Sequence, residues 1–266
     1  MLVDTSVLVD LTSYPIVDLE QPEASALVQR SRETLRSEGT VVLPGFLSPQ
    51  ARIEIAGEAR DGAPQAFFCD NTHNVYLAAD DESFGEDHPL RRRLHTVVGS
   101  VAFDLLTPDA RLRALYNWDP LVEFIRAVID VPELHRLADP LGSCSINVFR
   151  PGDAHAWHFD EAEYTTTIML QEADDGGYFE YLPHLRKPDG SEVERIASLL
   201  GGDETGVQRL SFSVGDLSIF GGRRSLHRVT EVVGDTTRLV AVLTFNTKPG
   251  VMNSESVRRL FWGRSG

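Results

Sequence analysis

The chain has 266 residues, and its 25 Lys and Arg against 40 Asp and Glu give a formal net charge of −15 at pH 7. Hydrophobic residues make up 42% and charged residues 24%, which is typical of globular proteins rather than disordered ones. An acidic surface repels phosphate backbones and anionic lipid headgroups, so we expect neither a nucleic-acid partner nor a membrane partner. The length allows a sizeable core, and we expect one domain over residues 1–266.

The sequence also points to a cytoplasmic protein. No run approaches about 18 consecutive apolar residues, so we expect no transmembrane helix. Residues 1–15 contain two acids and no basic residue, unlike a signal peptide. The two cysteines, Cys69 and Cys144, cannot form a disulfide framework, and no CxxC motif is present for zinc. We therefore expect the function to depend on a small-molecule site, and the sequence leaves the oligomeric state open.

Residues 1–138 have the pattern of a mainly helical support. Helical spacing of apolar residues and helix-start signals, such as Ser48 as N-cap before Pro49, predict several helices in this half. The predicted helices are Pro22–Arg36, the segment that begins at Ser48, Pro89–Leu106 and Pro120–Ile129, with a short apolar run at Thr40–Leu43.

Residues 139–266 have the pattern of a β-rich core. Short β-like runs are separated by Gly, Asp and Pro, and a short helix is expected at Ser191–Leu200 within a long crossover. Eight strands at this spacing are typical of a jelly roll, so the sequence predicts an α+β fold with a jelly-roll, cupin-like core braced by N-terminal helices. The expected strands are Cys144–Phe149, Ala154–Phe159, Tyr164–Leu170, Tyr178–Leu182, Val207–Phe212, Asp216–Phe220, His227–Val232 and Arg238–Phe245.

Two histidines and one acid form a candidate metal site. His158 and Asp160 are two residues apart, so in an extended strand their side chains point to the same face. His227 begins another predicted strand. Two imidazoles and a carboxylate can hold one face of an octahedral metal, which suits non-heme Fe(II) that takes an organic co-substrate and O₂. Zinc hydrolases also use two His and a carboxylate, so the ligand types alone do not decide the metal.

An arginine follows at the start of the last predicted strand. Alternation along that strand places Arg238, Val240, Val242 and Thr244 on one face. A guanidinium inside a barrel needs an anionic partner, because an unpaired buried charge is very costly. A bidentate bond to a ligand carboxylate would satisfy Arg238.

His158-Phe159-Asp160, followed by His227 and Arg238, resembles the Fe(II)/2-oxoglutarate-dependent oxygenase superfamily, whose core is a double-stranded β-helix. The resemblance implies that the triad holds Fe(II), that 2-oxoglutarate chelates this iron, and that Arg238 binds its distal carboxylate. A narrower group, the carrier-independent amino-acid radical halogenases and their hydroxylase relatives, resembles the chain in NVFRPGDAHAWHFDEAEYTTTIML, GGYFEYLP, GDLSIFGGRRSLHRVTEVVGDTTRLVAVLTF and RRLFWGR.

Within that group, halogenases carry Gly where this chain has Asp160, which opens a coordination site for chloride. Asp160 therefore implies a hydroxylase-type dioxygenase. The resemblance implies reaction with O₂ through a ferryl intermediate, release of succinate and CO₂, and hydroxylation of an unactivated C–H bond in a small polar substrate such as a free amino acid or a derivative. Desaturation or ring closure by the same oxidant, in natural-product biosynthesis, is the alternative.

Three charged or titratable residues are candidates for substrate contact. His155 lies three residues before His158, where strict alternation turns its side chain away from the metal, but the resemblance implies a histidine near the substrate here. Glu161 and Asp139 could each pair with a substrate ammonium group. A solvated loop acid and an Asp-Pro turn are the ordinary explanations of these two residues.

Three further candidates are less polar. Thr244 shares the face of Arg238 and would lie inside the barrel, as a ligand contact or as a hydrogen-bonded core residue. Thr166 is in phase with the two metal ligands that precede it and could assist 2-oxoglutarate binding. Trp262 could close over the pocket and donate its indole N–H to a substrate carboxylate, or simply dock the C-terminal segment.

Two other function classes remain open. A zinc- or manganese-dependent hydrolase or isomerase on a cupin-like barrel could use the same triad, but it would have no need of Arg238. A catalytically inert jelly roll could act as a binding module, although a decayed site would be expected to lose at least one of its four central residues. These are His158, Asp160, His227 and Arg238.

Overall fold

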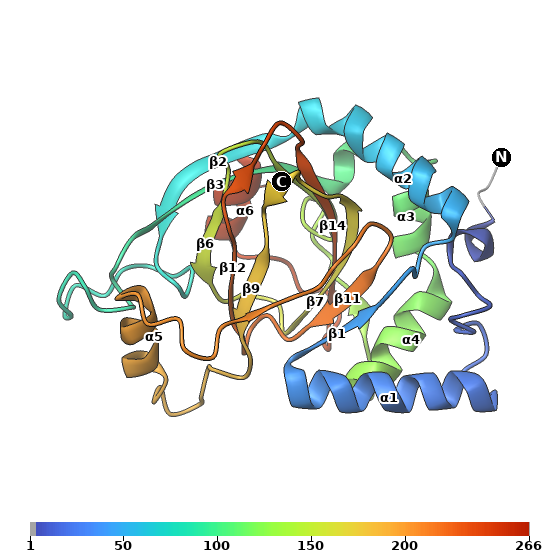
Figure 1. Cartoon of the computed structure of the whole chain (residues 1–266), viewed down its shortest axis with the longest axis horizontal. Helices are drawn as coiled ribbons and strands as arrows, with labels where there is room; N and C mark the ends of the chain where they lie inside the picture. Colours follow the sequence, from blue (N-terminus) through green and yellow to red (C-terminus); the bar gives the residue numbers. More distant parts are fainter. Residues whose placement is uncertain (1–3, 266) are drawn as a thin grey trace.

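The computed structural model describes residues 4–265 as helices packed against antiparallel sheets (Figure 1). The helices are α1 (Pro22–Glu38), α2 (Pro49–Gly62), α3 (Arg111–Tyr116), α4 (Asp119–Ile129), α5 (Val193–Leu200) and α6 (Glu255–Trp262), with 3-10 turns at Thr5–Leu8, Ala63–Gln65 and Phe103–Leu105. The strands are β1 (Thr40–Leu43), β2 (Phe67–His73), β3 (Leu94–Val101), β4 (His135–Arg136), β5 (Cys144–Phe149), β6 (His155–His158), β7 (Tyr164–Gln171), β8 (Asp175–Gly176), β9 (Phe179–Leu182), β10 (Gln208–Arg209), β11 (Leu217–Phe220), β12 (Leu226–Val229), β13 (Val232–Val233) and β14 (Arg238–Asn246).

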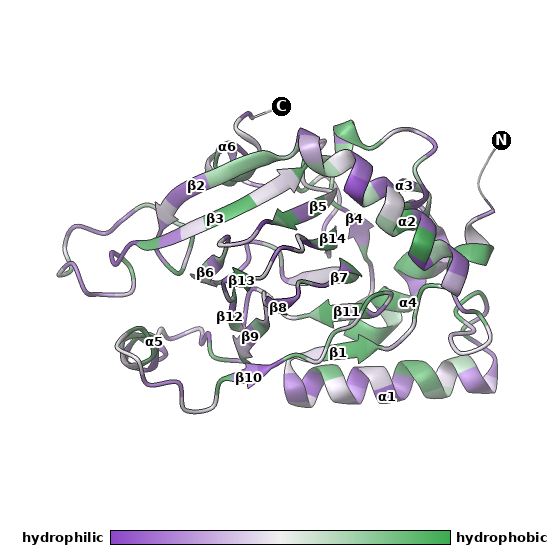
Figure 2. Cartoon of the chain, turned by 45° about the horizontal axis from the view of Figure 1, so that its top comes forward, coloured by the Kyte–Doolittle hydropathy of each residue, from purple (hydrophilic) through white to green (hydrophobic). Residues whose placement is uncertain are grey.

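Two antiparallel sheets, one large and one small, form most of the β-rich part, and β8 pairs with β13 in a separate two-stranded sheet. The large sheet has the order β1-β11-β7-β14-β5-β3-β2, with β4 paired to β14, and the small sheet has the order β10-β9-β12-β6. In Figure 2 the large sheet runs from β2 at the top to β1 at the bottom, and the small sheet lies to its left. The predicted combination of helices with antiparallel sheets is therefore confirmed.

The large sheet has one apolar face and one cavity face, as the alternation along β14 predicts. Leu239, Ala241 and Leu243 are buried in the main core together with side chains of α1, α2 and α4. Val240 and Val242 point to the other face, where they line a cavity. Each buried aliphatic side chain stabilises the fold by about 1.5–3 kcal/mol. The helical layer therefore packs firmly on the apolar face of the large sheet, and the cavity face remains available for a site.

Most predicted elements are present. The helix that begins after Ser48 is capped as expected, since the Ser48 hydroxyl accepts a hydrogen bond from the N–H of Ala51. The predicted strand Val207–Phe212 is reduced to β10, and His227–Val232 is divided between β12 and β13.

The predicted helix at Pro89–Leu106 was wrong. Residues 94–101 form β3, which pairs with β2 along its whole length and with β5 on its other side. Thr96, Val97 and Val98 are β-branched, and such residues favour a pleated strand over a helix. Residues 1–138 thus supply β1, β2, β3 and β4 to the large sheet, in addition to the helical layer.

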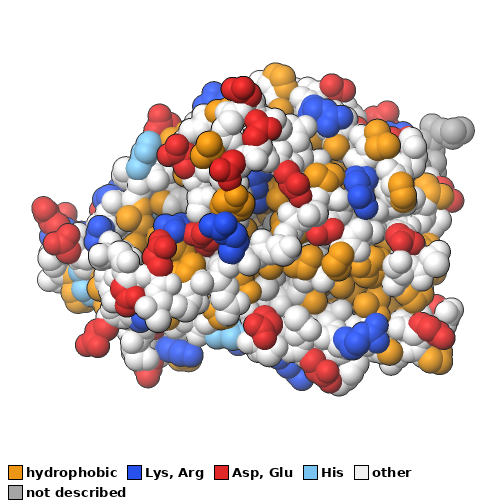
Figure 3. All heavy atoms as spheres, viewed as in Figure 1, with side chains coloured by type: hydrophobic (Ala, Val, Ile, Leu, Met, Phe, Trp, Pro, Cys, Tyr) orange, Lys and Arg blue, Asp and Glu red, His pale blue; other side chains and the backbone are white. Residues whose placement is uncertain are grey.

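Two whole-chain properties complete the description. On the face drawn in Figure 3, acidic and basic side chains are interspersed, so the excess negative charge is not gathered there into one patch. Among residues 4–265, no helix combines the length and the apolar character needed to cross a bilayer.

Candidate active site

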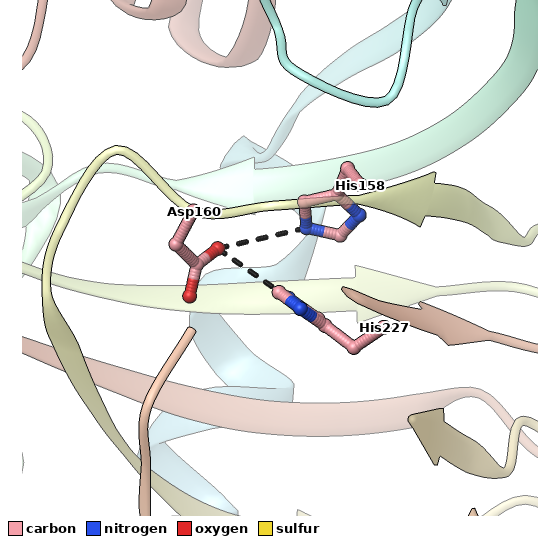
Figure 4. Close-up of side chains that lie close together, drawn as sticks. All are labelled: His158, Asp160 and His227. Carbon is pink, nitrogen blue, oxygen red and sulfur yellow. Dashed lines mark ion pairs between the residues drawn. The ribbon is translucent and has the colours of Figure 1, made fainter. Parts of the chain in front are cut away.

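The three predicted metal ligands lie together at the small sheet. His227 on β12 pairs directly with His158 at the end of β6, and Asp160 follows two residues later. Oδ1 of Asp160 lies 3.6 Å from Nε2 of His158 and 3.4 Å from Nε2 of His227. One donor atom from each residue falls within 4.8 Å of the other two (Figure 4). This spacing allows one cation to contact all three side chains.

The backbone fixes which nitrogen of each imidazole faces this centre. Nδ1 of His158 lies 2.8 Å from the carbonyl oxygen of Ala156, and Nδ1 of His227 lies 3.0 Å from that of Ser225. A ring nitrogen that faces a carbonyl carries the hydrogen, so both Nε2 atoms present lone pairs to the centre. Burial, helped by the neighbouring His227, lowers the pKa of His158, which favours the neutral form that a metal needs.

Asp160 is held as an ionised carboxylate. Burial alone would raise its pKa, but His227 and His158 outweigh burial and hold the pKa of Asp160 well below its usual range. Thr165 donates its hydroxyl hydrogen to Oδ2 of Asp160 at 2.7 Å. A Cβ atom at Gly222 would collide with the same carboxylate, so only glycine fits there. Thr165 and Gly222 therefore set the position of Asp160.

Two cavities meet at this centre, and His155, His158 and Asp160 line both. The first, of about 110 Å³, lies between the sheets and extends to Arg238; we call it the arginine-side cavity. The second, of about 120 Å³, extends to α6 and is called the helix-side cavity. The centre can thus contact two different ligands at once.

Arg238 begins β14 opposite Phe149 of β5 and is only 4% exposed. Its guanidinium lies 5.4 Å from the centre of the Phe149 ring, and among the described residues it has no hydrogen bond and no carboxylate within 4.0 Å. Burial lowers the pKa of Arg238 to about 10, although the charge of Glu172 opposes this. The group remains a cation, and a ligand carboxylate would supply the partner that the protein does not.

The comparison with protein families agrees with this geometry. A family model described as Halogenase D matches residues 23–259. The chain belongs to the Halogenase D family. No curated protein matches the sequence.

Solved structures similar to this Halogenase D family member share its fold at low identity. The epimerase SnoN from nogalamycin biosynthesis is 15% identical, with a TM-score of 0.59 over 84% of this chain and 81% of SnoN. A 2OG-Fe(II) oxygenase family oxidoreductase from Burkholderia pseudomallei is 17% identical, with a TM-score of 0.53 over 84% of this chain and 92% of that one. A Pseudomonas putida prolyl-4-hydroxylase is 15% identical, with a TM-score of 0.51 over 83% and 99%.

These comparisons confirm the predicted resemblance to the Fe(II)/2-oxoglutarate oxygenase superfamily. The predicted cofactors agree with a second SnoN structure, which was solved in complex with Fe3+, alpha ketoglutarate and nogalamycin RO. The family match also covers most of the N-terminal half.

His155 faces the centre despite its odd spacing from His158. The pairing of β12 with β6 shifts between His227 opposite His158 and Val229 opposite His155, so β6 contains an extra residue. Such a β-bulge turns both histidines to the same side. The two rings stack with their centres 3.8 Å apart, and Nε2 of His155 is buried with no hydrogen-bond partner among residues 4–265.

Thr244 and Trp262 both line the helix-side cavity. The indole N–H of Trp262 is buried and has no partner in the described part of the chain, so it is free to donate to a ligand. A Cβ atom at Gly142 would lie 2.6 Å from a ring carbon of Trp262, so the indole packs directly on the backbone of this turn.

The two candidate acids are already bound by protein groups. Glu161 lies at the cavity wall, but its oxygens accept hydrogen bonds from the hydroxyl of Ser254 at 2.6 Å and from its N–H at 3.0 Å. Asp139 is 1% exposed and accepts from the N–H groups of Leu141, Gly142 and Asn253. Asp139 is not among the residues that line the two cavities, and its contacts stabilise the turn that Asp-Pro begins.

Thr166 does not face the centre, contrary to the prediction. It is fully buried opposite Ile219 and Leu243, on the helical face of the large sheet. Thr165 and Thr167 line the arginine-side cavity instead. The loop at residues 161–163 separates β6 from β7, and alternation cannot be counted through a loop.

Proposed function

We propose that this Halogenase D family member is an Fe(II)/2-oxoglutarate-dependent dioxygenase of the hydroxylase type. It oxidises an unactivated C–H bond of a small polar substrate, such as a free amino acid or a derivative, and releases succinate and CO₂. The observation that carries this proposal is the buried guanidinium of Arg238, which has no partner in the described part of the chain and lies in a cavity that His158 and Asp160 also line. A hydrolase or isomerase would have no use for such a group.

The strand orders support a double-stranded β-helix. The run β11-β7-β14-β5 in the large sheet and the run β10-β9-β12-β6 in the small sheet supply four strands each. We propose that they form the catalytic core within residues 139–266 of a single domain, with residues 1–138 as its support. The two cysteines are buried and unpaired, which is compatible with the proposed cytoplasmic location.

The side chains fit iron and 2-oxoglutarate. His158, His227 and the ionised Asp160 match the donor set of non-heme iron, and Arg238 matches the distal carboxylate of 2-oxoglutarate. When bound, iron and 2-oxoglutarate supply the activation of O₂. The chain orients the ligand nitrogens through backbone carbonyls, holds the co-substrate between the sheets, and excludes water with buried walls.

The helix-side cavity is proposed to hold the substrate. Its volume of about 120 Å³ suits a small molecule. His155, Thr244 and Trp262 bring polar groups to it, and the free indole N–H of Trp262 matches a substrate carboxylate. Glu161 could receive a substrate ammonium group only by sharing its oxygens with Ser254. We therefore propose the first three residues as the main substrate contacts.

Asp160 supports hydroxylation rather than halogenation, since its carboxylate occupies the place that chloride would need. A second outcome has a specific observation in its favour. The epimerase SnoN and the carbocyclase SnoK, both named as non-heme alpha ketoglutarate dependent enzymes of nogalamycin biosynthesis, share this fold. Desaturation or ring closure in natural-product biosynthesis is therefore our alternative to hydroxylation.

Anaerobic titration of the metal-free protein with Fe(II) and then 2-oxoglutarate tests the proposal. We expect an iron-to-keto-acid charge-transfer absorption band in the wild-type protein and none in His227→Ala. The absence of a band in the wild-type protein would contradict the proposed cofactors. Succinate release in the presence of free amino acids and their derivatives then identifies the substrate, and a chlorinated product would contradict our interpretation of Asp160.

A further inference from the structure

His73, at the end of β2, is a buried histidine outside the metal centre. It is 3% exposed and belongs neither to the triad nor to the walls of the two cavities. Its Nδ1 lies 3.0 Å from the carbonyl oxygen of Asn74, and its Nε2 lies 2.7 Å from Oγ1 of Thr96. The nitrogen that faces the carbonyl carries the hydrogen, so Nε2 accepts and the Thr96 hydroxyl donates.

The Thr96 hydroxyl also forms a hydrogen bond with β6. Because its single hydroxyl hydrogen points to His73, the lone pairs of Oγ1 face the other way, and they accept the N–H of Ala156 at 3.0 Å. The carbonyl of the same Ala156 accepts Nδ1–H of His158. Ala156 of β6 thus donates its N–H to Thr96 and accepts the Nδ1–H of His158 at its C=O.

The two histidine ligands differ in the support that their strands provide. His227 lies on β12, which pairs with β9 on one side and β6 on the other. His158 lies on β6, the last strand of the small sheet, whose outer edge makes one isolated bridge, between Val97 and Ala154. The Thr96 hydroxyl occupies the next position along that edge, where a neighbouring strand would otherwise bind the N–H of Ala156.

We propose that His73 and Thr96 are positioning residues that hold the imidazole of His158 in its metal-binding orientation across the open edge of the small sheet. The inference rests on the proposed function only in that the triad binds Fe(II). Partners of this kind beyond the ligands themselves typically change metal affinity about 10- to 100-fold when they are removed.

The test compares Thr96→Val, which keeps the shape but removes the hydroxyl, with Thr96→Ser, which keeps the hydroxyl. Anaerobic Fe(II) titration should give a dissociation constant raised about tenfold or more in Thr96→Val and near the wild-type value in Thr96→Ser. His73→Phe should raise it in the same direction. Thr40→Val is the matched control, because Thr40 is also buried and hydrogen-bonded but lies on β1.

A second readout needs no metal. In the metal-free protein, hydrogen exchange at the Ala156 amide should accelerate in Thr96→Val, while exchange at the His227 amide stays unchanged. Unchanged Fe(II) affinity in Thr96→Val, or equal losses in Thr96→Val and Thr96→Ser, would overturn the positioning role. A wild-type protein without Fe(II) affinity would instead contradict the proposed function, and the Ala156 exchange would then still decide whether the Thr96 tether exists.

Discussion

The two cavities that meet at the triad are built from different parts of the chain. Strands of both sheets wall the arginine-side cavity, which contains a buried positive charge with no ion-pair or hydrogen-bond partner among residues 4–265. The helix-side cavity is walled partly by α6 and by the loop after Asp160, and the unpartnered groups of Trp262 and His155 there are neutral. The first cavity therefore suits one anionic ligand of fixed shape, whereas the second suits a neutral or hydrogen-bonding part of a ligand beside α6.

The largest expected effect is confined to the arginine-side cavity. Replacing Arg238 by Gln should weaken 2-oxoglutarate binding by about 3 kcal/mol, roughly 100-fold, because a buried charge pair loses one partner. Anaerobic titration of the charge-transfer band measures this, and Fe(II) affinity should stay unchanged. Trp262→Phe is the control, since it alters only the helix-side cavity. Equal losses of 2-oxoglutarate affinity in both variants would contradict the assignment of 2-oxoglutarate to the arginine-side cavity.

The buried histidines His73 and His155 predict how stability depends on pH. Burial, with His158 nearby, lowers the pKa of His73 to about 4, and burial lowers that of His155 well below its usual value. The unfolded chain binds protons at these groups below about pH 6.5, so the free energy of unfolding falls as the pH drops, by up to about 3 kcal/mol for His73 alone. Urea unfolding of the metal-free protein between pH 7 and pH 4.5 measures this loss. Stability that rises on acidification would be the contrary result.

A methyl group at Gly222 tests the centre that both cavities share. In Gly222→Ala the new Cβ displaces the Asp160 carboxylate, and Fe(II) affinity should fall about tenfold or more. Gly221→Ala is a closely matched control, because its Cβ would lie 3.6 Å from the nearest atom, the carbonyl oxygen of Gly39. Equal Fe(II) affinity in the two variants would show that Asp160 can move without loss.

The smallest expected effect is confined to the helix side. Ser254 caps α6, and its hydroxyl and N–H bind Glu161. Ser254→Ala should lower the free energy of unfolding by about 1 kcal/mol and accelerate hydrogen exchange in α6. The affinity for 2-oxoglutarate should not change, and a loss of that affinity would mean that the two cavities are coupled through α6.

Local periodicity was enough to predict the residues that lie within one strand or its immediate continuation. His158 and Asp160 follow from a spacing of two residues, and Arg238 follows from alternation along β14. His155 could not be assigned by alternation, because its orientation depends on a bulge that forms only when β6 pairs with β12. The resemblance to known halogenases, rather than spacing, placed it near the substrate.

Other features depend on tertiary contacts, which the spacing of residues in the sequence does not predict. Thr165 replaces Thr166 at the cavity because the loop at residues 161–163 resets the phase of β7. Gly222 was visible only as half of a Gly-Gly pair, and nothing local shows that its missing Cβ makes room for a carboxylate. Asp139 accepts from backbone N–H groups and Glu161 accepts from the N–H and the hydroxyl of Ser254, and a sequence does not reveal such partners.

The contact between Gly142 and Trp262 bears on how the range of accepted substrates could be changed. Because the side-chain amide of Asn253 and the indole of Trp262 both pack directly on the backbone at Gly142, an alanine there would displace both side chains. The triad and Arg238 lie on other elements and would keep their geometry. Under the proposed function, one added carbon atom on a turn would therefore reshape the substrate chamber while the oxidising machinery stays intact, which makes position 142 a natural starting point for changing the range of substrates.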